Sequence, residues 1–201
     1  MTASDLPAVR PGLVARLVGV GAILGAIVLP LALGDLGATL MTDAEEGAPA
    51  MRPVLPLAAS LLTFSAALAT LERRAARELG LSDLVGDLTI GTATVLVAIT
   101  PLVGSYVLLG PGFVLLFVGS VIFGVAGFDG KRRPRWGSTL VGVGAGGLLA
   151  TLLVVAAAIG RVEDIAGTAL LCLLLYSVGW AMLGLHLALA RPLVGTPDAA
   201  P

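Results

Sequence analysis

Long runs of apolar residues recur along the whole chain, separated by short polar segments. Six such runs lie at about 13–33, 54–71, 84–103, 111–128, 138–160 and 165–190. A helix of about 20 residues covers the roughly 30 Å hydrocarbon core of a bilayer. The runs are continuously apolar, whereas barrel strands alternate with a period of two. The pattern predicts an all-α polytopic membrane protein, a bundle of six transmembrane helices in a single domain over residues 1–201.

Two polar segments flank these runs. Residues 34–53 are expected to form an acidic extracytoplasmic loop, and residues 192–201 a short, flexible C-terminal tail. The sequence Ala32-Leu33-Gly34 also has the small-x-small form of a signal-peptidase site, so a cleaved signal over residues 1–34 is an alternative. The apolar stretch from Leu17 to Leu33 exceeds the usual signal core of about 7–15 residues, which favours an uncleaved first helix.

Composition supports the membrane assignment. Hydrophobic residues make up 57% of the 201-residue chain and charged residues only 12%, whereas soluble domains carry roughly 25%. The net charge of −1 provides no overall positive field, so no nucleic-acid partner is expected. Arg outnumbers Lys eleven to one, which is typical of a GC-rich genome. The chain resembles small multi-helix membrane proteins of prokaryotes, which predicts the plasma membrane as its location, and no motif ties it to a named family.

Basic residues are distributed unevenly between the two sides of a six-helix bundle. Ten of the twelve fall on one side, namely Arg10, Arg16, Arg73, Arg74, Arg77, Lys131, Arg132, Arg133, Arg135 and Arg191. Only Arg52 and Arg161 fall on the other side, among six acidic residues. Because short cytoplasmic loops carry the excess of Lys and Arg, this distribution predicts that both termini are cytoplasmic.

A stripe of small and polar residues marks the expected second and third helices. Asp83 and Asp87 are one turn apart at the start of the third run, and Thr94 follows on the same face. Ser60, Thr63 and Arg74 form a similar stripe on the second run. One interpretation is a polar path between the two helices, with Asp87 at its inner mouth and paired to Arg74. The alternative, which we favour, is ordinary packing of small residues and hydroxyl groups.

Glycine pairs and a basic cluster are the remaining features. Gly21 with Gly25, and Gly142 with Gly146, form GxxxG patterns that allow close helix packing. The cluster Lys131, Arg132, Arg133 and Arg135 is suited to anionic lipid headgroups, or serves only as a topology signal.

Motifs for catalysis and cofactor binding are not found in the sequence. Cys172 is the only cysteine and His186 the only histidine, so the sequence predicts no metal site, no cofactor and no catalytic residues. We therefore expect a non-catalytic accessory or structural membrane subunit, whose partners are the lipid bilayer and another membrane protein. A small transporter or channel is the second hypothesis. A membrane enzyme that acts at the cytoplasmic interface, around Asp83, Asp87, Arg74 and His186, is the third.

Overall fold

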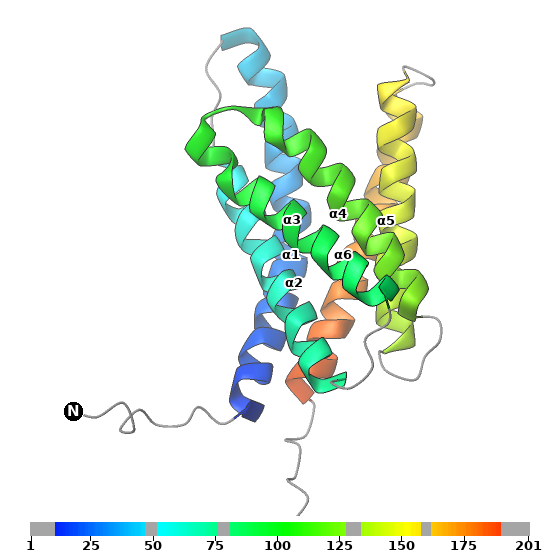
Figure 1. Cartoon of the computed structure of the whole chain (residues 1–201). Helices are drawn as coiled ribbons and strands as arrows, with labels where there is room; N and C mark the ends of the chain where they lie inside the picture. Colours follow the sequence, from blue (N-terminus) through cyan, green and yellow to red (C-terminus); the bar gives the residue numbers. More distant parts are fainter. Residues whose placement is uncertain (1–10, 47–51, 76–80, 128–133, 158–161, 190–201) are drawn as a thin grey trace, which may run out of the picture.

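The computed structural model describes residues 11–46, 52–75, 81–127, 134–157 and 162–189, and within these ranges it is helical and contains no strand (Figure 1). The prediction of an all-α chain is confirmed. The helices are α1 (Pro11–Glu46), α2 (Val54–Ala75), α3 (Leu81–Val103), the short 3-10 helix η2 (Tyr106–Leu108), α4 (Leu109–Ala126), α5 (Arg135–Ala156) and α6 (Val162–Leu189).

Six of these helical segments are long and apolar enough to cross a membrane, as the sequence predicts. The shortest spans have 20 residues and the longest has 28. At 1.5 Å of rise per residue, each therefore reaches about 30 Å or more, the thickness of the hydrocarbon core. Large apolar side chains also point outward along the helices, among them Leu17, Leu31 and Leu88. A surface of this kind is stable in lipid rather than in water.

The first helix extends well beyond its apolar run. We expected it to end near residue 33 and to be followed by an acidic loop over 34–53, but α1 continues to Glu46. Hydropathy marks where a helix leaves the hydrocarbon and does not mark where its hydrogen bonds end. Residues 34–46 are rich in Ala, Leu, Met and Glu, which all favour a helix in water as well as in lipid.

The helices are arranged in an up-and-down ring. Each transmembrane helix packs against the next along the chain, and α6 returns to pack against α1 and, less extensively, α2. The α2–α3 interface is the sparsest between successive helices. Because the helices alternate in direction, the start of α1 and the end of α6 lie at the same end of the bundle (Figure 1).

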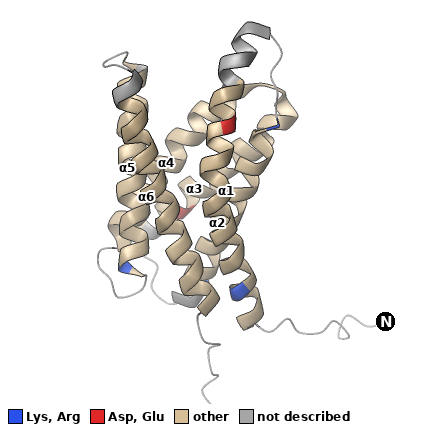
Figure 2. Cartoon of the chain, turned by 180° about the vertical axis from the view of Figure 1, so that it is seen from behind, with Lys and Arg blue, Asp and Glu red and all other residues tan. Residues whose placement is uncertain are grey.

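Charged residues distinguish the two ends. Arg16 near the start of α1, Arg73 near the end of α2 and Arg135 at the start of α5 lie at the end where α1 begins, which we call the basic end. Asp35 and Arg52 lie toward the opposite end. Between the ends, the described helices carry almost no charge (Figure 2).

A tight turn joins α3 to α4. Gly104 has φ +66°, in the left-handed region that side chains with a β-carbon rarely adopt, and its N–H donates to the carbonyl oxygen of Thr100 (3.1 Å). Ser105 then accepts a hydrogen bond from the N–H of Val107 (3.4 Å). This geometry ends α3 and reverses the chain, so α3 and α4 pack as an antiparallel pair.

Candidate functional site

Hydroxyl groups connect α2 to α3. Ser65 Oγ and Thr94 Oγ1 lie 2.8 Å apart, and Thr94, which is 2% exposed, also donates to the carbonyl oxygen of Ile90 (2.9 Å). When the single Thr94 hydroxyl proton is directed to Ile90, Ser65 is the donor in the pair. Such interhelical hydrogen bonds contribute about 0.6 kcal/mol in membrane bundles.

The other predicted hydroxyls of α2 face α1 rather than α3. A β-carbon built on Gly25 of α1 would meet Thr63 Oγ1, and would lie 3.3 Å from the Cα of Ser60. Ser60 Oγ donates to the carbonyl oxygen of Pro56 (2.9 Å), and Thr63 Oγ1 donates to that of Ser60 (2.7 Å). The structure therefore brings Thr94 together with Ser65, and it places Ser60 and Thr63 at a different interface.

Asp87 lies in the second turn of α3 and is half-buried. Both of its carboxylate oxygens are buried. The neighbouring Gly86 packs closely against α4. A β-carbon added to Gly86 would lie 3.4 Å from the carbonyl oxygen of Gly119. The side chains of Asp83 and Arg74, its expected neighbours, lie outside the described residues. His186 is on α6, which has no contact with α3 among the described residues, so Asp87 and His186 do not converge.

Five aromatic side chains meet in the middle of the ring, and we call them the aromatic cluster: Phe64 of α2, Phe117 and Phe123 of α4, and Tyr176 and Trp180 of α6. Phe64 stacks on Trp180 with ring centroids 4.5 Å apart, and Phe123 stacks on the same indole at 5.9 Å. Phe117 meets Tyr176 edge to face at 6.2 Å. No Cα atoms of α4 and α6 approach within 8 Å in the described residues, so side chains fill the space between these two helices.

Polar groups are embedded in this cluster. Tyr176 Oη and Ser120 Oγ lie 3.1 Å apart and join α6 to α4. Ser177 Oγ is also buried, and it has no hydrogen-bond partner among the described residues. A buried polar group without a partner costs about 1–3 kcal/mol. The Ser177 hydroxyl is therefore a local cost to the stability of the bundle.

Glycines permit the closest approaches between helices. A β-carbon on Gly184 of α6 would lie 2.6 Å from the carbonyl oxygen of Gly19 in α1. Gly124 of α4 and Gly142 of α5 are in direct backbone contact. Of the other glycines singled out in the sequence, Gly21 and Gly25 face Thr63 of α2, and Gly146 makes only an ordinary contact with Val121.

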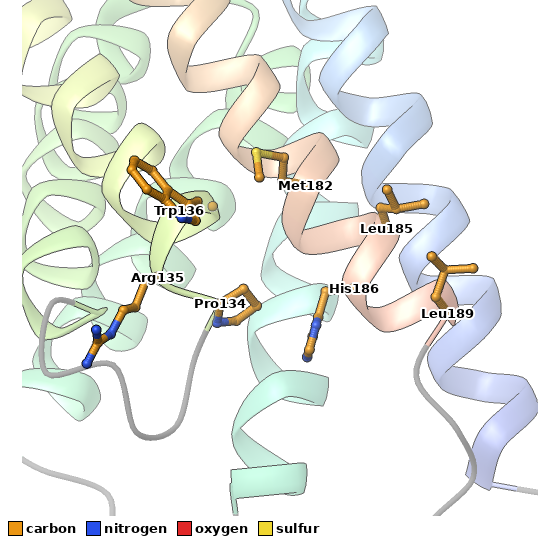
Figure 3. Close-up of a pocket in the computed structure, with 8 residues that line it drawn as sticks. Pro134, Arg135, Trp136, Met182, Leu185, His186 and Leu189 are labelled. Atoms are coloured by element: carbon orange, nitrogen blue, oxygen red, sulfur yellow. The ribbon is translucent and has the colours of Figure 1, made fainter.

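A groove opens at the basic end between the start of α5 and the end of α6. It has a volume of about 440 Å³ and is lined by Pro134, Arg135, Trp136, Gly137, Met182, Leu185, His186 and Leu189. Arg135 and His186 both point toward the basic end, whereas Met182 lies beside Trp136, deeper in the bundle (Figure 3). The groove is thus apolar on its inner side, and on its outer side Arg135 and His186 lie beside the apolar Pro134 and Leu189.

Of the predicted lipid-binding cluster, only Arg135 can be placed. It is exposed at the first position of α5 and lines the groove. Lys131, Arg132 and Arg133 lie outside the described residues. No group of three or more His, Cys, Asp or Glu residues gathers within the described parts of the chain.

Sequence reasoning missed the most extensive side-chain cluster in the bundle. The aromatic cluster was not predicted, although Phe64, Tyr176 and Trp180 lie in the middle of apolar runs, where aromatic residues are rare in this chain. Aromatic residues make up only 4% of the chain. The signal that the sequence offered was that several of these few residues lie within the apolar runs. No sequence pattern predicts the groove, because it depends on where the start of α5 lies relative to the end of α6.

Comparisons with known proteins provide no assignment. The chain matches no family model, no curated protein and no solved structure.

Proposed function

We propose that this chain is a non-catalytic protein of the prokaryotic plasma membrane, an accessory or structural subunit that acts through its outer surface. The observation that carries the proposal is the aromatic cluster, because its rings occupy the space between α2, α4 and α6 where a central path would run. Carrier and channel proteins instead line such a space with polar groups and water.

The hydroxyl groups of the bundle support the same proposal. Eight of them donate to a carbonyl oxygen four residues earlier in the chain, namely those of Ser60, Thr70, Thr89, Thr92, Thr94, Thr100, Ser138 and Thr151. A hydroxyl group has a single proton, and in this arrangement it donates that proton to the backbone carbonyl oxygen. It retains only acceptor capacity toward a permeating species.

The proposed orientation places the basic end in the cytoplasm. Ten of the twelve basic residues belong to this side of the chain, and this asymmetry is the positive-inside signal. A fusion of alkaline phosphatase after residue 201 should be inactive, and a fusion of green fluorescent protein at the same place should fluoresce. The reverse result would invert the orientation.

Purification in mild detergent tests the accessory role. The chain, expressed at its natural level in its own membrane, should co-purify with one other membrane protein at a fixed molar ratio. A catalytically silent but monodisperse and partnerless chain would contradict the proposal.

A small transporter is the second candidate, and the α2–α3 interface favours it. This interface is the sparsest between successive helices, it contains the Ser65–Thr94 pair, and α3 also carries the buried carboxylate oxygens of Asp87. Proteoliposomes that contain a pH-sensitive dye, under an imposed K⁺ or Na⁺ gradient, separate the two candidates. A transporter should show a flux that Asp87→Asn abolishes and Asp35→Asn leaves unchanged. An accessory subunit should leak no faster than empty liposomes.

A further inference from the structure

The groove between α5 and α6 has the two-part chemistry of a phospholipid site. Its inner walls are the side chains of Trp136, Met182 and Leu185, and its outer rim carries Arg135 and His186 (Figure 3). Along α6, Met182 precedes His186 by four residues, a rise of about 6 Å, and Leu185 and Leu189 flank His186 in the lining. A phospholipid changes from acyl chain to phosphate over a similar distance.

The position of the groove matches the level of the lipid headgroups. The α5 and α6 spans start at Arg135 and end at Leu189, so the groove lies where these helices leave the hydrocarbon. Trp136 is 75% exposed, and tryptophan at this level is typical of a membrane interface. A tail within the groove would therefore contact apolar walls, while its headgroup would lie beside the rim.

Charge complementarity determines which lipid fits. Arg135 is always protonated and can form paired hydrogen bonds to phosphate oxygens, and even a neutral imidazole at His186 provides one N–H donor. None of the described residues that line the groove is acidic.

We propose that this groove binds one anionic phospholipid, with its headgroup at the end of the groove that carries Arg135 and His186 and an acyl chain along Trp136, Met182 and Leu185. The proposal is independent of the accessory role, because a transporter with the same groove would bind the same lipid.

The two tryptophans of the chain provide a direct test. Trp136 borders the groove, whereas Trp180 is 0% exposed within the aromatic cluster. In a Trp180→Phe variant, Trp136 is the only reporter. This variant is reconstituted into phosphatidylcholine bilayers that contain either brominated phosphatidylglycerol or brominated phosphatidylcholine, because bromine quenches tryptophan on contact. Wild-type protein is measured in parallel, so that the result does not depend on how well the variant folds.

Brominated phosphatidylglycerol should quench Trp136 at a mole fraction several-fold lower than brominated phosphatidylcholine does. Each basic residue near an anionic surface contributes about 1 kcal/mol, so Arg135→Gln should weaken this preference about fivefold. His186→Gln should weaken it less. Arg73→Gln is the matched control, because Arg73 is an exposed arginine at the same end on α2, whose described residues do not contact those of α5.

Three results would overturn the proposal. Equal quenching by the two lipids would show that the groove does not select a charged headgroup. An equal loss of preference in Arg73→Gln and Arg135→Gln would show that only general surface charge attracts the lipid. Absence of quenching by either lipid would also overturn it, because Trp136 would then be shielded from lipid altogether.

Discussion

The two halves of the α5–α6 hairpin differ sharply in packing. From the basic end to Ala145 in α5 and Tyr176 in α6, both helices bury residues on every turn, and we call this part the packed half. Beyond it, residues 146–155 and 165–175 include no buried residue, and we call this part the open half. At the same end of the bundle, α1 still buries Leu36 and α4 buries Leu109. Burial at this end therefore continues in α1 and α4, whereas it stops in the α5–α6 hairpin.

The difference shows what holds helices together in lipid. Both halves are apolar, so hydrophobicity does not distinguish them, since lipid tails solvate leucine as well as a helix does. The packed half instead has close glycine contacts and the rings of Tyr176 and Trp180. In the open half, the close contact of Gly147 with Cys172 joins α5 to α6 rather than to the rest of the bundle, and a β-carbon on Gly167 would meet nothing within 4 Å. Close packing surfaces, rather than apolar ones, hold this hairpin to the bundle.

Removal of the central indole should have the largest effect. Trp180→Ala leaves a cavity between α2, α4 and α6 and should lower the free energy of unfolding by about 3–5 kcal/mol. The matched control is Leu171→Ala in the open half, where the side chain is 59% exposed, and its effect should stay below about 1 kcal/mol. Unfolding with SDS in mixed micelles measures both values. Equal losses would show that the two halves are packed alike.

Replacement of a closely packed glycine by a bulky residue should have the second largest effect on stability. Gly124→Leu must separate the backbones of α4 and α5 and should cost about 3 kcal/mol, the upper range for overpacking. Gly167→Leu places the same side chain in the open half and should be neutral or slightly stabilising, because leucine favours a helix. Melting of the purified protein in detergent compares the two variants. A destabilised Gly167→Leu would reveal a partner surface for the open half.

The hydrogen bond between Tyr176 and Ser120 should contribute less to stability than these packing contacts do. Tyr176→Phe and Ser120→Ala, combined in a double-mutant cycle, should give a coupling energy of about 0.6 kcal/mol. Unfolding with SDS gives the four free energies. A coupling energy near zero would mean that the two hydroxyls do not interact in the bilayer.

The Ser65–Thr94 hydrogen bond should contribute least to stability among the four interactions that these substitutions test. Thr94 already donates to Ile90, so loss of Ser65 leaves no unsatisfied donor, and Ser65→Ala should cost less than about 0.6 kcal/mol. Thermal melting of Ser65→Ala beside Ser60→Ala, whose hydroxyl bonds only within α2, provides the comparison. A loss of more than about 2 kcal/mol would indicate that this pair has a larger structural role.

The helices could be predicted from sequence more reliably than their contacts. Apolar runs are a property of each segment, so all six spans were predictable. α1 ends 13 residues beyond its predicted end, and the other helix boundaries differ from the predicted ones by up to four residues. The rotation of a helix toward its neighbours depends on the whole bundle. Ser60 and Ser65 are five residues apart, or about 140° around a helix. One therefore faces α1 and the other α3, and no pattern within α2 indicates which.

Water access to the middle of the ring is the most direct measurement of whether the chain acts through its outer surface. In a Cys172→Ser background, single cysteines at Ser120, Thr94 and the exposed Leu81 are treated with a membrane-impermeant thiol reagent in proteoliposomes. Cysteine at Leu81 should react quickly, and cysteines at Ser120 and Thr94 should not react, because aromatic rings and helix contacts exclude water there. Labelling of Ser120→Cys or Thr94→Cys at a rate close to that of Leu81→Cys would reveal an aqueous path and contradict the filled interior.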